Sequence, residues 1–435
     1  MRRYESYKDS GVEWLRQIPS HWDVQRSKFI FKKIERKVNE EDQIVTCFRD
    51  GQVTLRANRR TEGFTNALKE HGYQGIRKGD LVIHAMDAFA GAIGISDSDG
   101  KATPVYSVCL PHDKQKIDVY FYAYYLRNLA LSGFISSLAK GIRERSTDFR
   151  YADFAELLLP IPSYLEQQKI AQFLDDKTAK IDQALDLAEK QIALLKEHKQ
   201  ILIQNAVTRG LNPDVPLKDS GVKWTGQVPE HWDIKRFRNL FDFGKGLSIT
   251  KENLQDEGIP CVNYGEVHSR YGFEVIPERD ALKCVDSKYL VFNNSMLNKG
   301  DFVFADTSED IEGSGNFTYL NSSTRIFAGY HTVITRLKIT AIHRYIAYYF
   351  DSLSFRNQIR NKVKGVKVFS ITQSILKGTF VLLPNLKEQQ QIADYLDTQT
   401  AKIDQAIALK TAHIEKLKEY KSVLINDVVT GKVQV

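Results

Sequence analysis

The sequence predicts an α+β chain built as an internal repeat, in which each of two globular mixed α/β domains is followed by one long helix. Residues 166–208 and 388–430 are identical at 24 of 43 positions when they are aligned at a constant offset of 222. Residues 8–31 and 218–241 match at 13 of 24 positions at an offset of 210. A repeat at fixed spacing outranks local signals. The chain therefore divides into a short repeated segment, here called the leader (residues 8–31 and 218–241), a globular domain and a long helix, and each of these occurs twice.

Each copy of the longer repeat predicts one long helix with defined ends. The expected ends are marked by capping-box pairs and by terminal glycines: Ser163 with Glu166, Asn385 with Glu388, Gly210 and Gly431. Apolar residues recur three and four positions apart in both copies, as at Ile170, Leu174 and Ile181, and again at Ile392, Leu396 and Ile403. At about 1.5 Å per residue, each helix would reach roughly 65 Å. Two matched seams favour pairing of these helices over the alternative, an ordinary helix packed on a globular core.

The globular parts share their edges and differ in their middles. The predicted boundaries are 1–163 for the first domain, 164–210 for its helix, 211–385 for the second domain and 386–435 for the second helix. Residues 76–96 predict a strand, a Gly-rich turn and a second strand, and their counterpart 297–317 keeps the Lys-Gly-Asp opening. Further strands are expected at 104–110 and 330–337, and aromatic helices at 118–129 and 343–353. Residues 42–75 and 242–296 share almost no pattern. This is the arrangement expected of two readers with different targets.

Composition limits the class of protein. With 435 residues, several domains are expected. No apolar run is long enough to span a bilayer, and the N-terminal residues lack the apolar core of a signal peptide. The four cysteines are scattered, without a CxxC pair or a histidine at metal-ligand spacing, which predicts reduced thiols in a cytoplasmic protein.

Basic charge is concentrated in the globular segments. Residues 1–164 and 216–387 carry net charges of +4 and +5, whereas 165–215 and 388–435 carry −1 each. This distribution suits globular domains that contact a polyanion and helices that contact protein. It is a weak signal alone, since many domains that bind no nucleic acid have a similar excess.

The repeated leader is expected to have a packing role. Both copies contain the same tryptophan, proline and histidine residues, at Trp14, Pro19, His21 and Trp22 and at Trp224, Pro229, His231 and Trp232. No paired carboxylate or nucleophile accompanies the histidine. The pattern therefore favours a rigid aromatic turn over a catalytic site.

Common catalytic signatures are missing from the sequence. There is no GxxxxGK[ST], HExxH or GxSxG motif. No Asn-Pro-Pro-aromatic run of the kind found in amino-methyltransferases occurs, and Asp242-Phe243-Gly244 lacks the other kinase motifs. The chain is therefore predicted to be non-catalytic, and the alternative is a single-chain nuclease or methyltransferase with an unfamiliar site.

Basic, aromatic and amide residues at expected turns are the candidate DNA contacts. In the first domain they are Arg56, Arg59, Arg60, Lys140, Arg143 and Arg145. In the second they are Asn263, Tyr264, Arg270, Tyr271, Lys364 and Lys367. Lysine and arginine neutralise phosphates, and arginine and asparagine also read base edges. For each residue a solvated surface position is an equal alternative, and the three cations within 140–145 are the strongest candidates.

These features together resemble the specificity subunit of type I restriction–modification enzymes. The resemblance is carried by DSGVEWLRQIPSHWDV and DSGVKWTGQVPEHWDI, and by EQQKIAQFLDDKTAKID and EQQQIADYLDTQTAKID. It covers nearly the whole chain except the unlike middles. It implies two target recognition domains, each reading one half of a bipartite DNA site, and an antiparallel coiled coil of the two helices that spaces them.

The resemblance also implies partners. Two modification subunits would hold S-adenosylmethionine, and restriction subunits would use ATP and Mg to translocate double-stranded DNA. No cofactor or metal is then expected in this chain. A coiled-coil scaffold without DNA affinity is the remaining alternative, but it gives no reason for unlike middles or for segregated basic charge.

Overall fold

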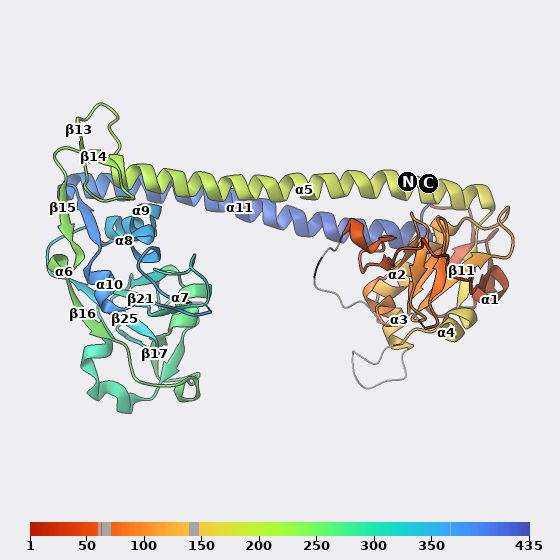
Figure 1. The fold of residues 1–435 in the computed structure, drawn as a ribbon, viewed down its shortest axis with the longest axis horizontal. Coiled ribbons are helices and arrows are strands. Elements are labelled where there is room, and N and C mark those ends of the chain that lie inside the picture. Colours follow the sequence, from red (N-terminus) through yellow and green to blue (C-terminus); the bar gives the residue numbers. More distant parts are fainter. Residues whose placement is uncertain (60–61, 63–70, 139–147, 366) are drawn as a thin grey trace. The chain divides into compact units, whose positions relative to one another are not determined.

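The computed structural model describes residues 1–59, 62, 71–138, 148–365 and 367–435. Two compact units make up the chain (Figure 1). The first contains Met1–Glu189 and Thr411–Val435, and the second contains Lys190–Lys410. Helices α5 (Tyr164–Arg209) and α11 (Leu386–Val429) contribute one part to each unit.

The first unit is built around an antiparallel four-stranded sheet in the order β4-β11-β8-β9. Its strands are β1 (Tyr7–Asp9), β2 (Gln17–Pro19), β3 (Asp23–Arg26), β4 (Phe31–Lys33), β5 (Val45–Cys47), β6 (Val53–Leu55), β7 (Gln74–Ile76), β8 (Leu81–His84), β9 (Ile93–Ile95), β10 (Gly100–Ala102), β11 (Tyr106–Pro111) and β12 (Leu158–Ile161). Its shorter helices are α1 (Ser27–Ile30), η1 (Arg56–Asn58), η2 (Ala88–Ala90), α2 (Val119–Leu131), α3 (Phe134–Ser137) and α4 (Tyr151–Glu156).

The second unit has a five-stranded sheet, β16-β25-β21-β23-β18, and a four-stranded sheet, β19-β17-β24-β20. Its strands are β13 (Leu217–Asp219), β14 (Gln227–Pro229), β15 (Asp233–Arg236), β16 (Phe241–Lys245), β17 (Ile259–Val262), β18 (Phe273–Val275), β19 (Lys283–Val285), β20 (Met296–Leu297), β21 (Phe302–Ala305), β22 (Thr307–Ser308), β23 (Phe317–Leu320), β24 (Ile326–Ala328), β25 (Thr332–Leu337), β26 (Phe369–Ser370) and β27 (Phe380–Leu383). Its shorter helices are α6 (Phe237–Leu240), η4 (Lys251–Asn253), α7 (Tyr264–Ser269), η5 (Ser287–Val291), η6 (Asn293–Ser295), α8 (His343–Asp351), α9 (Leu353–Arg360) and α10 (Gln373–Lys377).

A common scaffold underlies both units. Strands β4, β11, β8 and β9 of the first correspond to β16, β25, β21 and β23 of the second, and the pairing register is the same. Tyr106 faces His84 in one sheet as Thr332 faces Ala305 in the other. The Lys-Gly-Asp turn also repeats, because Gly79 and Gly300 both have a φ of 89°. A side chain is strained at that angle, so glycine is the residue that the turn favours.

The long helices belong to the hydrophobic cores of the units. Ile170, Leu174 and Leu424 are buried with aromatic residues of α2 in the first unit. In the second unit, helix residues such as Ile392 and Leu396 are buried beneath α8, which lies between the strands and the helices in Figure 1. Apolar burial of this kind is worth about 25 cal/mol per Å². The apolar seam read from the sequence therefore serves the domain cores as well as helix pairing.

Several sequence predictions about the elements are confirmed. Helix α5 begins at Tyr164, directly after the expected cap Ser163, and α11 begins directly after Asn385. Gly210 and Gly431 follow these helices with φ values of 76° and 74°. The strand expected at 330–337 begins two residues later, at Thr332. The reason is that the two preceding residues form a turn.

Candidate nucleic-acid interface

The repeated leader is fastened to the start of a long helix in each unit. His21 Nε2 lies 3.0 Å from Glu166 Oε2, and the Tyr4 hydroxyl donates to the same carboxylate at 2.6 Å. In the second unit His231 Nε2 lies 2.9 Å from Glu388 Oε2. The caps expected from the capping-box spacing are present, since Glu166 N donates to Ser163 Oγ at 3.4 Å and Glu388 N donates to Asn385 Oδ1 at 3.0 Å. The carboxylates of the two glutamates bond to the N-terminal segment of each unit.

The helix pair of each unit is joined by the same kind of ion pair. Lys421 Nζ lies 2.6 Å from Asp182 in the first unit, and Lys199 Nζ lies 2.7 Å from Asp404 in the second. Asp404 is the repeat of Asp182, and Lys421 is the repeat of Lys199, at the offset of 222. The two helices therefore exchange roles between the units.

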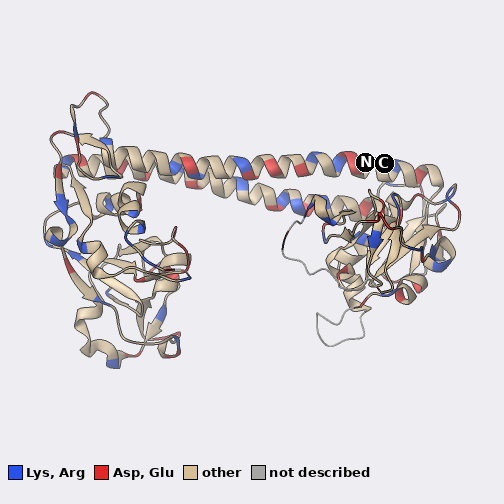
Figure 2. Ribbon diagram, viewed as in Figure 1, with Lys and Arg blue, Asp and Glu red and all other residues tan. Residues whose placement is uncertain are grey.

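The direction of pairing follows from contacts within the second unit. Lys199 of α5 bonds to Asp404 of α11, and Gln191 of α5 accepts a hydrogen bond from Lys410 of α11 at 2.6 Å. Moving backward along α5 thus moves forward along α11. The helices are therefore antiparallel. Charged residues of both signs alternate along them (Figure 2).

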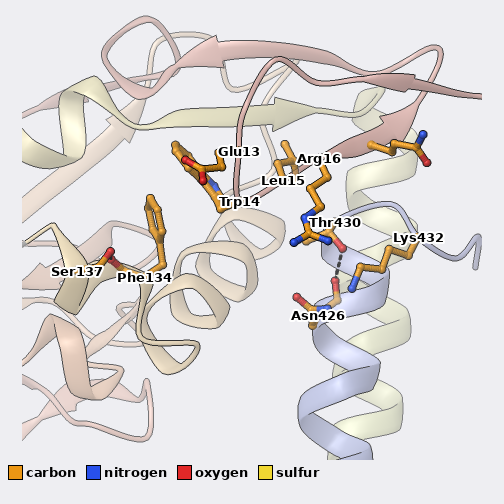
Figure 3. A pocket seen from close by; sticks show the side chains of 10 residues that line it. Glu13, Trp14, Leu15, Arg16, Phe134, Ser137, Asn426, Thr430 and Lys432 are labelled. Atoms are coloured by element: carbon orange, nitrogen blue, oxygen red, sulfur yellow. Dashed lines mark hydrogen bonds between the residues drawn. The ribbon is translucent and has the colours of Figure 1, made fainter.

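A recess of about 810 Å³ lies between the first leader and the end of α11 (Figure 3). Trp14 packs on Phe134 with ring centroids 4.2 Å apart. Arg16 extends toward Thr430 and has a φ of 55°, whereas its repeat Gly226 has a φ of 68°. The recess thus combines an apolar wall from Trp14 and Phe134 with polar groups at the helix end.

Both leaders expose a tryptophan at the same position. Trp14 is 36% exposed and Trp224 is 39% exposed, whereas the second tryptophan of each leader, Trp22 and Trp232, is fully buried. The sequence-based expectation of packing is confirmed for the buried pair. The exposed pair is a large aromatic surface that occurs once in each unit, and such residues are typical anchors of protein interfaces.

Within residues 1–59, 62, 71–138, 148–365 and 367–435, no three histidine, cysteine or carboxylate side chains gather as metal ligands. Across the same ranges, no helix combines the length and apolar character that crossing a bilayer requires.

Known proteins share both the sequence pattern and the fold. The type I restriction modification DNA specificity domain matches residues 229–419. A putative type I restriction enzyme MjaX specificity subunit from Methanocaldococcus jannaschii is 25% identical over 452 residues, covering 99% of this chain and 97% of the relative. The type I restriction enzyme EcoKI specificity subunit of Escherichia coli is 28% identical over 305 residues, covering 66% of this chain and 61% of the relative.

Residues 229–419 are a type I restriction modification DNA specificity domain, and the whole chain is similar to type I specificity subunits. Two solved structures share its fold. One is a chain of a type I restriction–modification complex, with a TM-score of 0.69, 16% identity and coverage of 96% of this chain and 99% of that one. The other is the HsdS subunit from Thermoanaerobacter tengcongensis, with a TM-score of 0.53, 16% identity and coverage of 96% and 98%.

In the first domain, the structure places two of the six candidate contacts. Arg56 begins η1, and its Nε lies 3.5 Å from Thr46 Oγ1. Arg59 ends the same turn, pairs with Asp50 at 2.6 Å and lies over the Phe48 ring. The other four, Arg60, Lys140, Arg143 and Arg145, lie outside the described residues.

In the second domain the candidates separate into surface and buried positions. Lys364 and Lys367 are exposed on the segment before β26, and Arg270 is exposed at the end of α7. Tyr264 is half-buried and lines a hollow of about 620 Å³ that Val368 also lines. The structure therefore brings Tyr264 close to the lysine-containing segment and leaves Arg270 at the other end of its helix.

Asn263 and Tyr271 have structural roles in the second domain. Asn263 is 2% exposed, caps α7 with Glu266, and lies where a side chain on Gly329 would clash with it. Tyr271 is 8% exposed, and its hydroxyl donates to the Ala281 carbonyl at 2.8 Å. Neither side chain is presented to a ligand, so the interpretation as surface contacts is corrected to capping and packing.

Two rings of this surface, the exposed His331 and the half-buried Tyr330, are not among the residues that the sequence pattern indicates. Tyr330 and His331 form the turn between β24 and β25, and both pack near Tyr264. They were assigned to the start of a strand because the apolar pattern of β25 directly follows them. The usable signal was Gly329, since a glycine between two short strands marks a turn.

Proposed function

We propose that this chain is the DNA-recognition subunit of a type I restriction–modification complex and reads a bipartite, asymmetric site in double-stranded DNA. Each globular domain reads one half of the site. The subunit performs no bond-breaking step itself, and specificity resides in side chains that differ between the two domains. The observation that carries the proposal is a repeated scaffold with unlike middles.

The repeat gives both domains the same backbone scaffold, and each scaffold carries a different surface for contacting DNA. In the first unit Phe149 N donates to the Ala85 carbonyl, and in the second Ile371 N donates to the Asp306 carbonyl. In the second unit β17 and β19, which come from the unlike segment, extend the β20–β24 pair, and that pair repeats the β7–β10 pair of the first unit. Two unlike readers imply two unlike half-sites, with unread bases between them.

The helix pair sets the separation of the half-sites in this proposal. Antiparallel helices with exchanged roles suit a DNA target that has its own local dyad. Positive charge favours the globular segments over the helices, at +4 and +5 against −1 and −1. The helices therefore act as a spacer, and the domains contact phosphates and base edges.

Two modification subunits are the proposed partners, one for each unit. The support is the exposed tryptophan that each leader presents, because two equivalent surfaces suit two copies of one partner. S-adenosylmethionine would be held by those subunits, and ATP with Mg by restriction subunits that translocate DNA. Such a complex would act in the cytoplasm.

Partner binding is tested with Trp14→Ala, Trp224→Ala and the double variant. Truncating an anchor of this kind weakens an interface by about 2 kcal/mol, or roughly 30-fold. Mass photometry with the modification subunit should show two copies bound to the unaltered chain, one to each single variant and none to the double variant. Phe29→Ala is the control, because Phe29 is 61% exposed and lies outside the recess. An unchanged stoichiometry in the double variant contradicts this docking surface.

DNA recognition is tested by sequencing methylated bases in cells that express the chain with its modification subunit. The proposal predicts a motif with two unlike halves and a fixed unread gap. A continuous motif, or methylation without sequence preference, contradicts it.

A further inference from the structure

Three aromatic rings form a cluster on the second unit. Tyr264 from α7 lies 5.6 Å from Tyr330 and 5.3 Å from His331, measured between ring centroids. Tyr330 and His331 are 5.9 Å apart, and all three ring pairs are edge-to-face. His331 is exposed and the two tyrosines are half-buried. The half-buried Tyr264 and Tyr330 therefore pack against the exposed imidazole of His331 and support it.

The backbone of His331 is strained. Its φ is 55°, and among the described residues only Arg16, Phe273 and His331 combine a side chain with a positive φ. The turn is fixed by a hydrogen bond from the Thr332 hydroxyl to the Gly329 carbonyl at 2.6 Å. Strain that the surroundings enforce on an exposed side chain is typical of functional positions.

The first unit has the same backbone hydrogen bond between apolar residues. Asp306 N donates to the His331 carbonyl at 3.0 Å, and at the repeated position Ala85 N donates to the Val105 carbonyl at 3.1 Å. Val105 is not among the described residues with positive φ. Asp306 and His331 thus stand where the first unit has Ala85 and Val105, so the shared scaffold does not require polar residues at these two positions. Specificity-determining residues are expected at such positions.

The partner of His331 defines which ring nitrogen carries hydrogen. Nδ1 lies 3.2 Å from Asp306 Oδ1, and an ionised carboxylate only accepts hydrogen bonds. Nδ1 therefore holds the hydrogen, and in the neutral ring Nε2 is a bare acceptor. The same Asp306 oxygen accepts from the Thr307 hydroxyl at 2.7 Å, which holds the carboxylate in place.

Acidic and basic side chains both lie near the cluster. The hollow beside Tyr264 is lined by Glu309, Asp310 and Glu312, which repel phosphate and accept from donors. Lys364 and Lys367 are exposed on the segment whose Val368 lines the same hollow. The lysines suit a DNA backbone, and the carboxylates suit base amino groups.

We propose that His331 Nε2, oriented by Asp306 and supported by Tyr264 and Tyr330, accepts a hydrogen bond from an exocyclic amino group in the half-site read by the second domain. The donor is adenine N6 or cytosine N4 in the major groove, because these are the amino groups displayed there. This inference rests on the proposed function. It adds the residue and the chemical group that it reads.

The experiment compares methylated motifs from cells that express the unaltered chain, His331→Gly or Asp306→Ala together with the modification subunit. Glycine suits the positive φ, and alanine is the residue of the first unit, so both variants are expected to melt within about 2 °C of the unaltered protein. Discrimination at one position of one half-site should fall about tenfold in His331→Gly, and by less in Asp306→Ala. The other half and the gap should not change. His413→Gln is the control, because His413 is exposed on α11.

Binding to modified duplexes then tests the chemical group. Purine in place of adenine, or 2-pyrimidinone in place of cytosine, removes the amino group at the relaxed position. The unaltered protein should lose about tenfold in affinity, and His331→Gly should lose nothing further. An unchanged motif in His331→Gly, or a uniform loss of methylation in a folded variant, overturns the inference. Absence of any motif with the unaltered chain overturns the proposed function instead.

Discussion

Arg344 shows how one side chain connects the second domain to its helix. Its Nε donates to Asp397 of α11 at 2.6 Å, and its Nη1 donates to Glu274 of β18 at 2.5 Å. The guanidinium also lies over the Phe273 ring, 4.7 Å from its centroid. The first unit has Tyr120 at the equivalent position, so this connection is specific to the second unit.

Replacement of Arg344 by alanine should destabilise the second unit by about 2 kcal/mol, since it leaves two partly buried carboxylates without their cation. Burial favours protonation of Glu274, but Arg344, Asn321 and Arg279 outweigh it and hold the pKa below the ordinary value. A carboxyl group with a lowered pKa stabilises the fold above its unfolded pKa of about 4.3, and this stabilisation is lost as pH falls through the folded pKa. Thermal melts at pH 7 and below pH 4 should show the difference between the two proteins narrowing in acid. A constant difference would exclude the ionic explanation.

The cations at 140–145 remain the strongest candidates for phosphate contact in the first domain. Replacing Lys140, Arg143 and Arg145 with alanine should weaken binding to duplexes that carry the first half-site and reduce the salt slope by up to about 3. Fluorescence anisotropy at several salt concentrations measures both quantities. Unchanged affinity and slope would show that these residues are ordinary surface charges.

At the scale of elements, the long helices are defined by their ends and by exchanged contacts. Each starts at a cap that the sequence indicates, and each offers a glutamate to the leader histidine, Glu166 to His21 and Glu388 to His231. The ion pairs at Asp182 and Asp404 repeat with the helices exchanged. The sequence repeat therefore produces the same helix contacts in both units.

The charge pair predicts a compensating double variant. Asp182→Lys places two lysines opposite each other and should lower the free energy of unfolding by about 0.5–1 kcal/mol, because both partners are partly exposed. Adding Lys421→Asp should restore most of that loss. Urea titration of the unaltered protein, the two single variants and the double variant gives the coupling free energy between Asp182 and Lys421. The same cycle at Asp404 and Lys199 is the matched control. Purely additive effects would mean that the pairs contribute nothing to helix pairing.

Periodicity and repeats predicted the elements well, because helix caps and apolar seams are local features. The aromatic helix α2, for example, spans Val119–Leu131 where 118–129 was expected. The candidate site was predicted less well. The buried position of Tyr271 involves a hydrogen bond to the carbonyl of Ala281, ten residues along the chain. The exposure of His331 depends on a tight turn with a positive φ. Neither feature can be predicted from the adjacent residues alone.

At the scale of the whole molecule, the central claim is that a repeated frame carries two unlike readers and that helix length fixes the gap between their half-sites. The shared frame explains why one chain can combine two targets without redesign of the rest. The apolar pair Ala85 and Val105 against the polar pair Asp306 and His331 illustrates the principle. On this account, DNA specificity is determined by the residues that differ between the two repeats.

The most direct test inserts four residues after Thr178 and maps methylation in cells that express the altered chain with the modification subunit. Four residues add about 6 Å of helix, just over one turn, so the apolar seam can pair again one turn along. At about 3.4 Å per base pair, the gap should lengthen by one or two base pairs while both half-sites stay the same. Methylation that keeps the original spacing, or a change in either half-site, would contradict the account.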